Sequence, residues 1–137
     1  MYFSRNNIDE YGLSKDKKGI SNMKIYRATL RDSIWTDIED LSINHTEYST
    51  QHPALNKDDT QLYFSSDWLG GFGGSDIYVV DINPDGTLGV PTNVGDIINT
   101  KNSEGFPFIN NEGTLFFSSD GHPGLGLLDI FGTIQGE

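Results

Sequence analysis

Short runs of β-favouring residues alternate with turn-forming residues along most of the chain. The run at residues 61–66 (QLYFSS) mixes aromatic and small polar side chains, and the run at residues 76–82 (DIYVVDI) is rich in β-branched residues. Such runs, bounded by Gly, Pro, Asn and Asp, are typical of β-strands. The glycine-rich residues 68–75 between them indicate a hairpin connection. No long segment has the 3.6-residue period of an amphipathic helix, so the pattern predicts an all-β protein.

The same strand motifs occur more than once. Residues 62–67 (LYFSSD) match residues 115–120 (LFFSSD), 53 positions further on, and residues 1–6 (MYFSRN) are a looser copy. The second motif, at residues 76–79 (DIYV), also recurs 53 positions later, at residues 129–132 (DIFG). Collinear motifs at one constant offset indicate a structural repeat.

Each repeat predicts up to four short antiparallel strands. In the middle copy an inner strand at residues 51–55 precedes the two runs above, and an outer strand at residues 89–95 follows the turn at residues 83–86. Four short strands every 40–50 residues are typical of a β-propeller blade. We therefore expect consecutive four-stranded antiparallel blades of a partial β-propeller over residues 1–137. The predicted blades are an incomplete one at residues 1–41, a complete one at residues 51–95 and an incomplete one at residues 105–134.

The number of blades matters because propellers close with about four to eight of them. Two partial blades and one whole blade cannot close a ring. We therefore expect the chain to be a piece of a longer protein or to assemble with other copies, because exposed blade edges need neighbours. Within the chain, apolar strand residues should fill the interfaces between blades. They are Tyr63, Ile77, Tyr78, Phe116, Phe117, Ile130 and Phe131.

Composition agrees with this architecture and narrows the function classes. Sixteen glycines suit the hairpins, and eight Phe, six Tyr and two Trp suit the spaces between blades. The absence of cysteine excludes disulfides and cysteine-ligated metals. A net charge of −11 argues against nucleic acid as a partner. No apolar run is long enough to span a membrane, and there is no signal-peptide pattern.

Residues 52–86 carry the most specific sequence, HPALNKDDTQLYFSSDWLGGFGGSDIYVVDINPDG. With Asn99-Thr100, residues 104–109 (EGFPFI) and residues 120–126 (DGHPGLG), they resemble the WD-like propeller repeats related to TolB. More narrowly, they resemble the version of this repeat in Bacteroidetes outer-membrane proteins of the OmpA/peptidoglycan-associated type, including PorE-like proteins. Two departures are Leu127, where the middle repeat has Gly74, and Asp59, where a turn glycine is common. Both indicate local variation in turns.

The resemblance implies a non-catalytic scaffold in the periplasm or outer membrane of a Gram-negative bacterium. It implies protein partners in the cell envelope, in some members connected with type IX secretion. Peptidoglycan binding in that family belongs to an OmpA-like domain that these residues do not include. Two alternatives remain open: an accessory propeller of a prolyl-oligopeptidase-like peptidase, and a calcium- or carbohydrate-binding module.

The glycine-rich loops are flanked by recurring carboxylates. Asp67 and Asp76 enclose the loop of the middle repeat, and Asp120 and Asp129 enclose that of the third. A pair of carboxylates across a hairpin could hold a hard cation, but we expect each to accept hydrogen bonds from loop amides. Loops on a rigid scaffold also carry recognition. The residues that we expect at such an interaction rim are Trp68, Phe72, His122 and Leu125.

Residues 81–86 resemble the first half of a calcium-binding loop. Asp81, Asn83 and Asp85 occupy its first, third and fifth positions, followed by Gly86. The twelfth position, which should be Glu, is Thr92. Turn chemistry explains all of these residues, so we expect no cofactor, with calcium as the weak alternative.

The sequence offers little for catalysis. It has three histidines, His45, His52 and His122, in unrelated repeat positions, and no G-x-S-x-G nucleophile motif. The latter two histidines precede prolines, which suits turns or strand entries better than a catalytic base. We therefore expect a protein that is not an enzyme.

Overall fold

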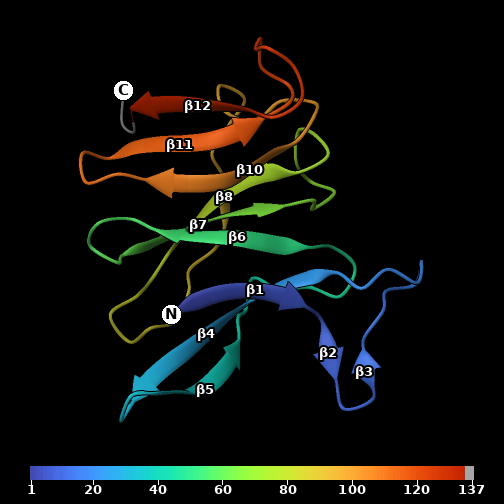
Figure 1. The fold of residues 1–137 in the computed structure, drawn as a ribbon, viewed down its shortest axis with the longest axis vertical. Helices are drawn as coiled ribbons and strands as arrows, with labels where there is room; N and C mark the ends of the chain where they lie inside the picture. The colour runs from blue at the N-terminus through green and yellow to red at the C-terminus, as the bar shows by residue number, and fades with distance from the viewer. Residues whose placement is uncertain (135–137) are drawn as a thin grey trace.

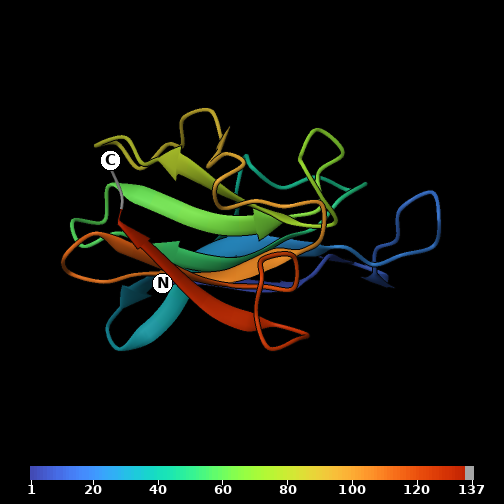
Figure 2. The ribbon, with the colours of Figure 1, turned by 90° about the horizontal axis from the view of Figure 1, so that it is seen from above.

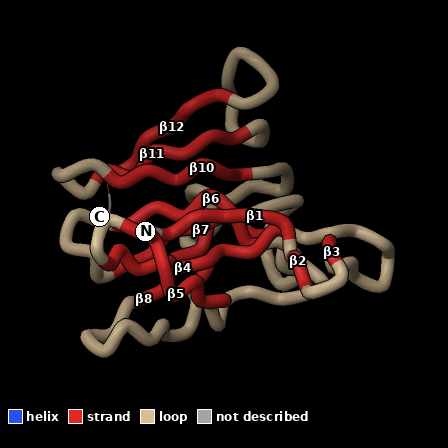
Figure 3. Tube along the Cα trace, turned by 60° about the horizontal axis from the view of Figure 1, so that its bottom comes forward, coloured by secondary structure: helices blue, strands red, loops and turns tan. Residues whose placement is uncertain are grey.

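The computed structural model describes residues 1–134, and these residues form β-strands, turns and loops without a helix (Figure 3). The predicted all-β fold is confirmed, with antiparallel sheets of two to four strands and no closed ring in this part of the chain. The strands are β1 (Tyr2–Asn6), β2 (Ile8–Asp9), β3 (Gly12–Leu13), β4 (Met23–Arg31), β5 (Ile34–Asp40), β6 (Thr50–Leu55), β7 (Gln61–Ser66), β8 (Asp76–Asp81), β9 (Thr92–Asn93), β10 (Glu104–Ile109), β11 (Thr114–Ser119) and β12 (Asp129–Ile134).

The strands form three consecutive sheets and one small hairpin. Sheet I has the order β1-β4-β5, sheet II β6-β7-β8-β9 and sheet III β10-β11-β12, while β2 and β3 pair only with each other. Figure 1 shows the sheets following one another along the long axis, from sheet III at the top to sheet I at the bottom. Strand β6 lies beside β1 on one side and beside β10 on the other (Figures 1 and 3).

The repeat found in the sequence is also a repeat of strand register. In sheet II Ser66 pairs with Asp76, and in sheet III Ser119 pairs with Asp129, 53 positions later. The inner strands β6 and β10 each shift register around one residue with a positive φ. These residues are His52, with φ 56°, and Phe106, with φ 51°. The two sheets therefore share even the local irregularity of their inner strands.

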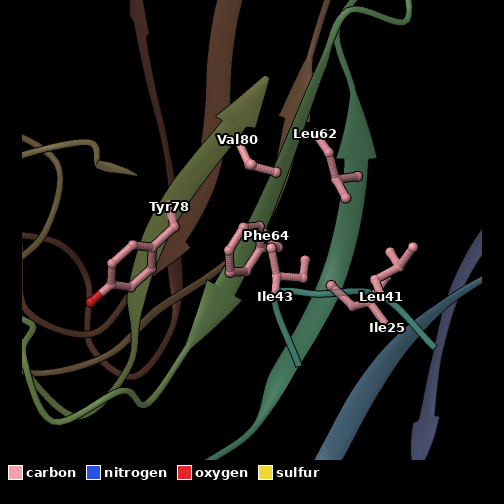
Figure 4. Packing of buried hydrophobic residues seen from close by; sticks show 7 residues of the cluster. All are labelled: Ile25, Leu41, Ile43, Leu62, Phe64, Tyr78 and Val80. Carbon is pink, nitrogen blue, oxygen red and sulfur yellow. The ribbon is translucent and has the colours of Figure 1, made fainter. Parts of the chain in front are cut away.

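The core between sheets I and II is built from alternate residues of β7 and β8 (Figure 4). Leu62 and Phe64 of β7 lie with Tyr78 and Val80 of β8 on one face of sheet II. Sheet I supplies Ile25 from β4, together with residues that follow β5. Side chains alternate between the faces of a strand, so this set uses only every second residue.

The intervening residues of the same strands form the core between sheets II and III. Tyr63 and Ile77 pack against Ile109, Leu115 and Phe117 of sheet III. Sheet II is therefore buried on both faces, which explains why its central strands are almost continuously apolar. Of the apolar residues predicted to fill interfaces, those of sheet II do so, as do Phe117 and the partly buried Phe131 of sheet III.

Phe116 and Ile130 do not fill an interface among the described residues. They occupy the repeat positions of Tyr63 and Ile77, which are 1% and 0% exposed, yet they are 36% and 81% exposed. The physical reason is that they lie on the face of sheet III that points away from sheet II. No described strand covers that face.

Two local features differ from the sequence prediction, and a third, at Asp59 and Leu127, agrees with it. The outer strand predicted over residues 89–95 is only β9, because Pro91 lacks an N–H and Gly95 turns the chain with φ 98°. The β2–β3 hairpin was not predicted. Asp59 adopts φ 56° where the third repeat has Gly113, and Leu127 adopts φ 59°, so both departures from the repeat are strained turn positions.

Candidate interaction site

The glycine-rich loop of sheet II is docked onto sheet III. The Gly74 amide donates to the Asn102 carbonyl at 2.6 Å, and the Glu104 amide donates to the Ser75 carbonyl at 2.8 Å. The Ser75 hydroxyl also donates to the Glu104 carbonyl at 3.1 Å. The second half of the loop is therefore a fixed link between two sheets rather than a free connection.

The contact between this loop and sheet III requires a glycine at position 73. A Cβ atom on Gly73 would overlap the carbonyl oxygens of Thr100 and Asn102, which are backbone atoms and cannot turn aside. At Gly70, in the same loop, a Cβ would meet only the Trp68 ring, at 3.9 Å. The glycines of this loop thus have different roles.

A buried carboxylate shapes the first half of the loop. Asp76 is almost fully buried, and its Oδ2 accepts hydrogen bonds from the Phe72 amide and from Nδ2 of Asn93, the latter at 3.1 Å. A Cβ on Gly71 would overlap the same oxygen. The predicted role of Asp76 in fixing the loop is confirmed.

Sheet III repeats this arrangement. Oδ2 of Asp129 accepts from the Leu125 amide at 2.7 Å and from the Gly126 amide at 3.1 Å. A Cβ on Gly124 would overlap this oxygen, as one on Gly71 would overlap that of Asp76. Sheets II and III therefore each have one loop-capping carboxylate at the same repeat position.

The first carboxylate of each pair binds an amide outside the glycine-rich loop, so the prediction that it caps the loop is wrong for Asp67 and Asp120. Oδ1 of Asp67 accepts from the Ser49 amide at 2.6 Å, and Oδ1 of Asp120 accepts from the Ser103 amide at 2.8 Å. Each bond ties the end of the second strand to the entry of the inner strand of its own sheet. The two carboxylates that flank a loop are thus engaged separately, each with its own backbone amide.

Apolar side chains project from the loop that Asp76 fixes. Trp68 and Phe72 are 44% and 50% exposed, and Leu69 is almost fully exposed. The Trp68 ring stacks on Tyr48 with centroids 6.0 Å apart and lies 5.7 Å from Tyr78. Burial raises the pKa of both tyrosine hydroxyls. We call Tyr48, Trp68, Leu69 and Phe72 the aromatic rim.

A small hollow of about 130 Å³ opens beside the aromatic rim. Tyr48 and Trp68 form part of its wall, with Pro91 and Phe64. Three hydroxyl side chains, those of Ser42, Thr50 and Ser66, add polar groups. The hollow is suited to receive a side chain of a partner rather than a large ligand.

The other two predicted rim residues have different environments. Leu125 is fully exposed on the loop of sheet III. His122 is half-buried: its ring packs on Phe117 and Phe131, and its Nε2 lies 2.7 Å from the Ile98 carbonyl oxygen. His122 therefore belongs to the packing between sheets II and III.

Two asparagine side chains bond to the backbone of a strand as a neighbouring strand would, and neither was predicted. Oδ1 of Asn99 accepts from the Ile77 amide at 2.8 Å, and its Nδ2 donates to the Ile77 carbonyl at 2.9 Å. Asn44 makes the same two bonds to Ile25 of sheet I, at 2.9 and 2.6 Å. Each side chain replaces a stretch of neighbouring strand. The recurring Ile-Asn pairs at residues 43–44 and 98–99 are the signal that could have revealed them.

A buried glutamate was also missed. Glu104 is almost fully buried at the start of β10. It accepts hydrogen bonds from the amide and hydroxyl of Thr100, at 2.8 and 2.7 Å, and from the Ser119 hydroxyl at 2.5 Å. Such hydrogen bonds compensate the cost of burying a carboxylate, so Glu104 is a structural group.

The three calcium candidates are engaged in a turn and its neighbouring strand. Oδ1 of Asp85 accepts from the amide and hydroxyl of Thr87, which lowers the pKa of this carboxyl. Asn83 donates to the Thr87 hydroxyl at 3.0 Å, and Asp81 accepts from Gln61 of β7 at 3.0 Å. Within residues 1–134 no group of three or more His, Cys, Asp or Glu side chains is arranged to hold a metal ion.

We expect calcium to leave the stability of the protein unchanged. Asp81, Asn83 and Asp85 already have local partners, so a cation would have to break these bonds before it gained ligands. Thermal unfolding with and without millimolar calcium, on wild type and Asp85→Asn, measures this. A rise in Tm that depends on calcium and is lost in Asp85→Asn would contradict the expectation.

No protein-family model, curated protein or solved structure matches this chain. Among the residues that the structure describes there is no helix of the length and apolar character needed to cross a membrane.

Proposed function

We propose that the chain is a non-catalytic scaffold that binds a protein partner through the aromatic rim. The observation that carries this proposal is that Trp68 and Phe72 are exposed on a loop whose backbone is fixed from two sides. On one side, Asp76 accepts a hydrogen bond from the Phe72 amide. On the other side, backbone hydrogen bonds to Asn102 and Glu104 hold residues 74–75 against sheet III. Exposed aromatic side chains on a pre-organised loop lose little entropy on binding and are common anchors of protein interfaces.

We further propose that sheets I, II and III are consecutive blades of a partial β-propeller of the TolB-related type. The constant register offset, the two-sided burial of sheet II and the link between its glycine-rich loop and sheet III support this. The resemblance of residues 52–86 supports a cell-envelope location, in the periplasm or outer membrane, with a partner of the same compartment.

A photo-crosslinking experiment tests two of these proposals: binding through the aromatic rim and the location in the cell envelope. Benzoylphenylalanine replaces the exposed Leu69 in the rim, and the matched control carries it at Lys57, in the turn between β6 and β7 at the opposite end of the sheet. The purified protein is irradiated in separate envelope and soluble extracts of the source cells. We expect one saturable product in the envelope extract, at position 69 only.

The product should be competed by unlabelled wild-type protein and reduced about tenfold or more by Trp68→Ala, as for an interface anchor. Equal crosslinking from positions 57 and 69, or indifference to Trp68→Ala, would refute binding through the rim. A product found only in the soluble extract would refute the envelope location.

A further inference from the structure

The hollow beside the aromatic rim is built from a part of the chain that contains no Lys or Arg. Its walls come from residues 42–50, residues 64–68 and Pro91. The stretches that include them, residues 32–56 and 58–100, contain twelve acidic residues and no Lys or Arg. Because a surface of one charge sign attracts groups of the opposite sign, this distribution indicates a basic ligand for the hollow.

Two exposed carboxylates flank the walls of the hollow. Asp67 directly precedes the wall residue Trp68, and Glu47 directly precedes the wall residue Tyr48. Oδ1 of Asp67 accepts from the Ser49 amide at 2.6 Å, which leaves its Oδ2 for an incoming group. The ion pairs found among residues 1–134 lie within sheet I and involve neither carboxylate. Both carboxylates are therefore available to a cation.

The walls also present aromatic rings. The rings of Tyr48, Trp68 and Tyr78 follow one another with centroids 6.0 and 5.7 Å apart. The first two meet because the segment after β5 and the loop between β7 and β8 lie at the same end of the molecule (Figure 2). The face of an aromatic ring attracts a cation, and tryptophan attracts it most strongly. Rings and carboxylates together make the hollow suitable for a cationic side chain.

Arginine fits these walls better than lysine does. A guanidinium group has five N–H donors in one plane, so it can stack on a ring and donate sideways at the same time. The hydroxyl oxygens of Ser42, Thr50 and Ser66 in the walls can accept such bonds. The same kind of stacking already occurs within the chain, where the guanidinium carbon of Arg5 lies 4.3 Å from the centroid of the Tyr26 ring.

We propose that the hollow binds an arginine side chain from a basic segment of the partner protein, with the guanidinium stacked on the rings of Trp68 and Tyr48 and its charge balanced by Asp67 and Glu47. The hollow measures about 130 Å³, whereas pockets for small-molecule ligands begin at roughly 300 Å³, so one side chain is the fitting occupant. This inference rests on the proposed function, because it names the partner chemistry of the same aromatic rim.

Three peptides test the charge and the shape of the ligand. Each is an acetylated and amidated hexapeptide, Gly-X-Ser-Gly-X-Ser, in which X is arginine, lysine or citrulline, the uncharged isostere of arginine. The indole N–H resonance of Trp68 reports binding in NMR titrations, and that of Trp35 on β5 is the internal reference. We expect the arginine peptide to shift only the Trp68 resonance. Its Kd should be about tenfold lower than that of the citrulline peptide and about threefold lower than that of the lysine peptide.

Variants test the two parts of the site separately. Asp67→Asn retains the oxygen that accepts from the Ser49 amide but removes the charge, so it should weaken binding of the arginine peptide about threefold or more and leave the citrulline peptide unaffected. Asp58→Asn is the matched control and should bind as wild type does, because it removes the same charge in the exposed turn at the other end of sheet II (Figure 2). Trp68→Leu should weaken binding about tenfold or more, measured from the Tyr48 amide resonance. Thermal unfolding checks that each variant is folded.

Equal affinities for the arginine and citrulline peptides overturn the proposal, as does a preference for the lysine peptide. Equal effects of Asp67→Asn and Asp58→Asn, or equal shifts of the Trp35 and Trp68 resonances, also overturn it, because they indicate general attraction to a negative surface. The crosslinking experiment distinguishes this failure from failure of the proposed function. A product at position 69 that depends on Trp68 but is not competed by excess arginine peptide would keep the aromatic rim as the interface and refute the arginine anchor. Selective binding of the arginine peptide without any product that depends on Trp68 would refute the proposed function and support the arginine site.

Discussion

Gly73→Ala should destabilise the protein more than any other single methyl addition in the glycine-rich loop. The new Cβ would overlap the carbonyl oxygens of Thr100 and Asn102. Relief requires the loop to move away from sheet III, which breaks the bond between the Gly74 amide and the Asn102 carbonyl. Overpacking and a lost hydrogen bond together cost about 3 kcal/mol, or roughly 10 °C in Tm.

Urea unfolding monitored by tryptophan fluorescence measures this loss, with Gly70→Ala as the matched control. Gly70 lies in the same loop, but its added Cβ meets only Trp68 at ordinary contact distance, 3.9 Å, so we expect a change within about 0.5 kcal/mol. Amide hydrogen exchange supplies a local measurement. The amides of Gly74 and Glu104, which link the two sheets, should exchange faster in Gly73→Ala. Equal stability of the two variants would show that the loop is not held against sheet III.

Asn99→Ala should be nearly as damaging, although it removes only a small polar side chain. Asn99 is buried and bonds to both the amide and the carbonyl of Ile77, and it donates to Asn93 at 2.8 Å. The Ile77 carbonyl keeps a bond from the Val94 amide at 3.2 Å, but the Ile77 amide loses its acceptor. A buried unsatisfied donor and the lost bonds cost about 3 kcal/mol.

Two further asparagines make this prediction specific. Asn83→Ala removes one exposed hydrogen bond in a turn and should cost within about 0.5 kcal/mol. Asn44→Ala removes the same pair of bonds from Ile25, but at a half-exposed site where water can replace them, so we expect an intermediate loss of about 1–2 kcal/mol. Chemical denaturation gives all three values. The prediction fails if Asn99→Ala is no more damaging than Asn83→Ala.

The candidate site was predictable where it depends on local chemistry. Asp76 and Asp129 could be assigned to their loops because Asp beside a glycine-rich turn commonly accepts backbone hydrogen bonds. Trp68, Phe72 and Leu125 could be placed at the surface because glycine-rich turns lie there. His122 shows the limit of this reasoning, because a His-Pro sequence favours a turn but gives no sign that the ring packs between Phe117 and Phe131.

The sequence by itself determined the two central strands of each repeat, the repeat itself and the turns between those strands. These depend on alternation, on β-branched and aromatic content, and on residues that favour particular φ values, all of which are local properties. Only the tertiary structure decided which of two equivalent residues is covered. Tyr63 and Phe116 stand in the same motif, yet one is buried and the other exposed, because burial depends on whether another sheet packs on that face. Likewise Gly70 and Gly73 read alike in the sequence, and only the approach of Thr100 and Asn102, some thirty residues further on, makes one of them indispensable.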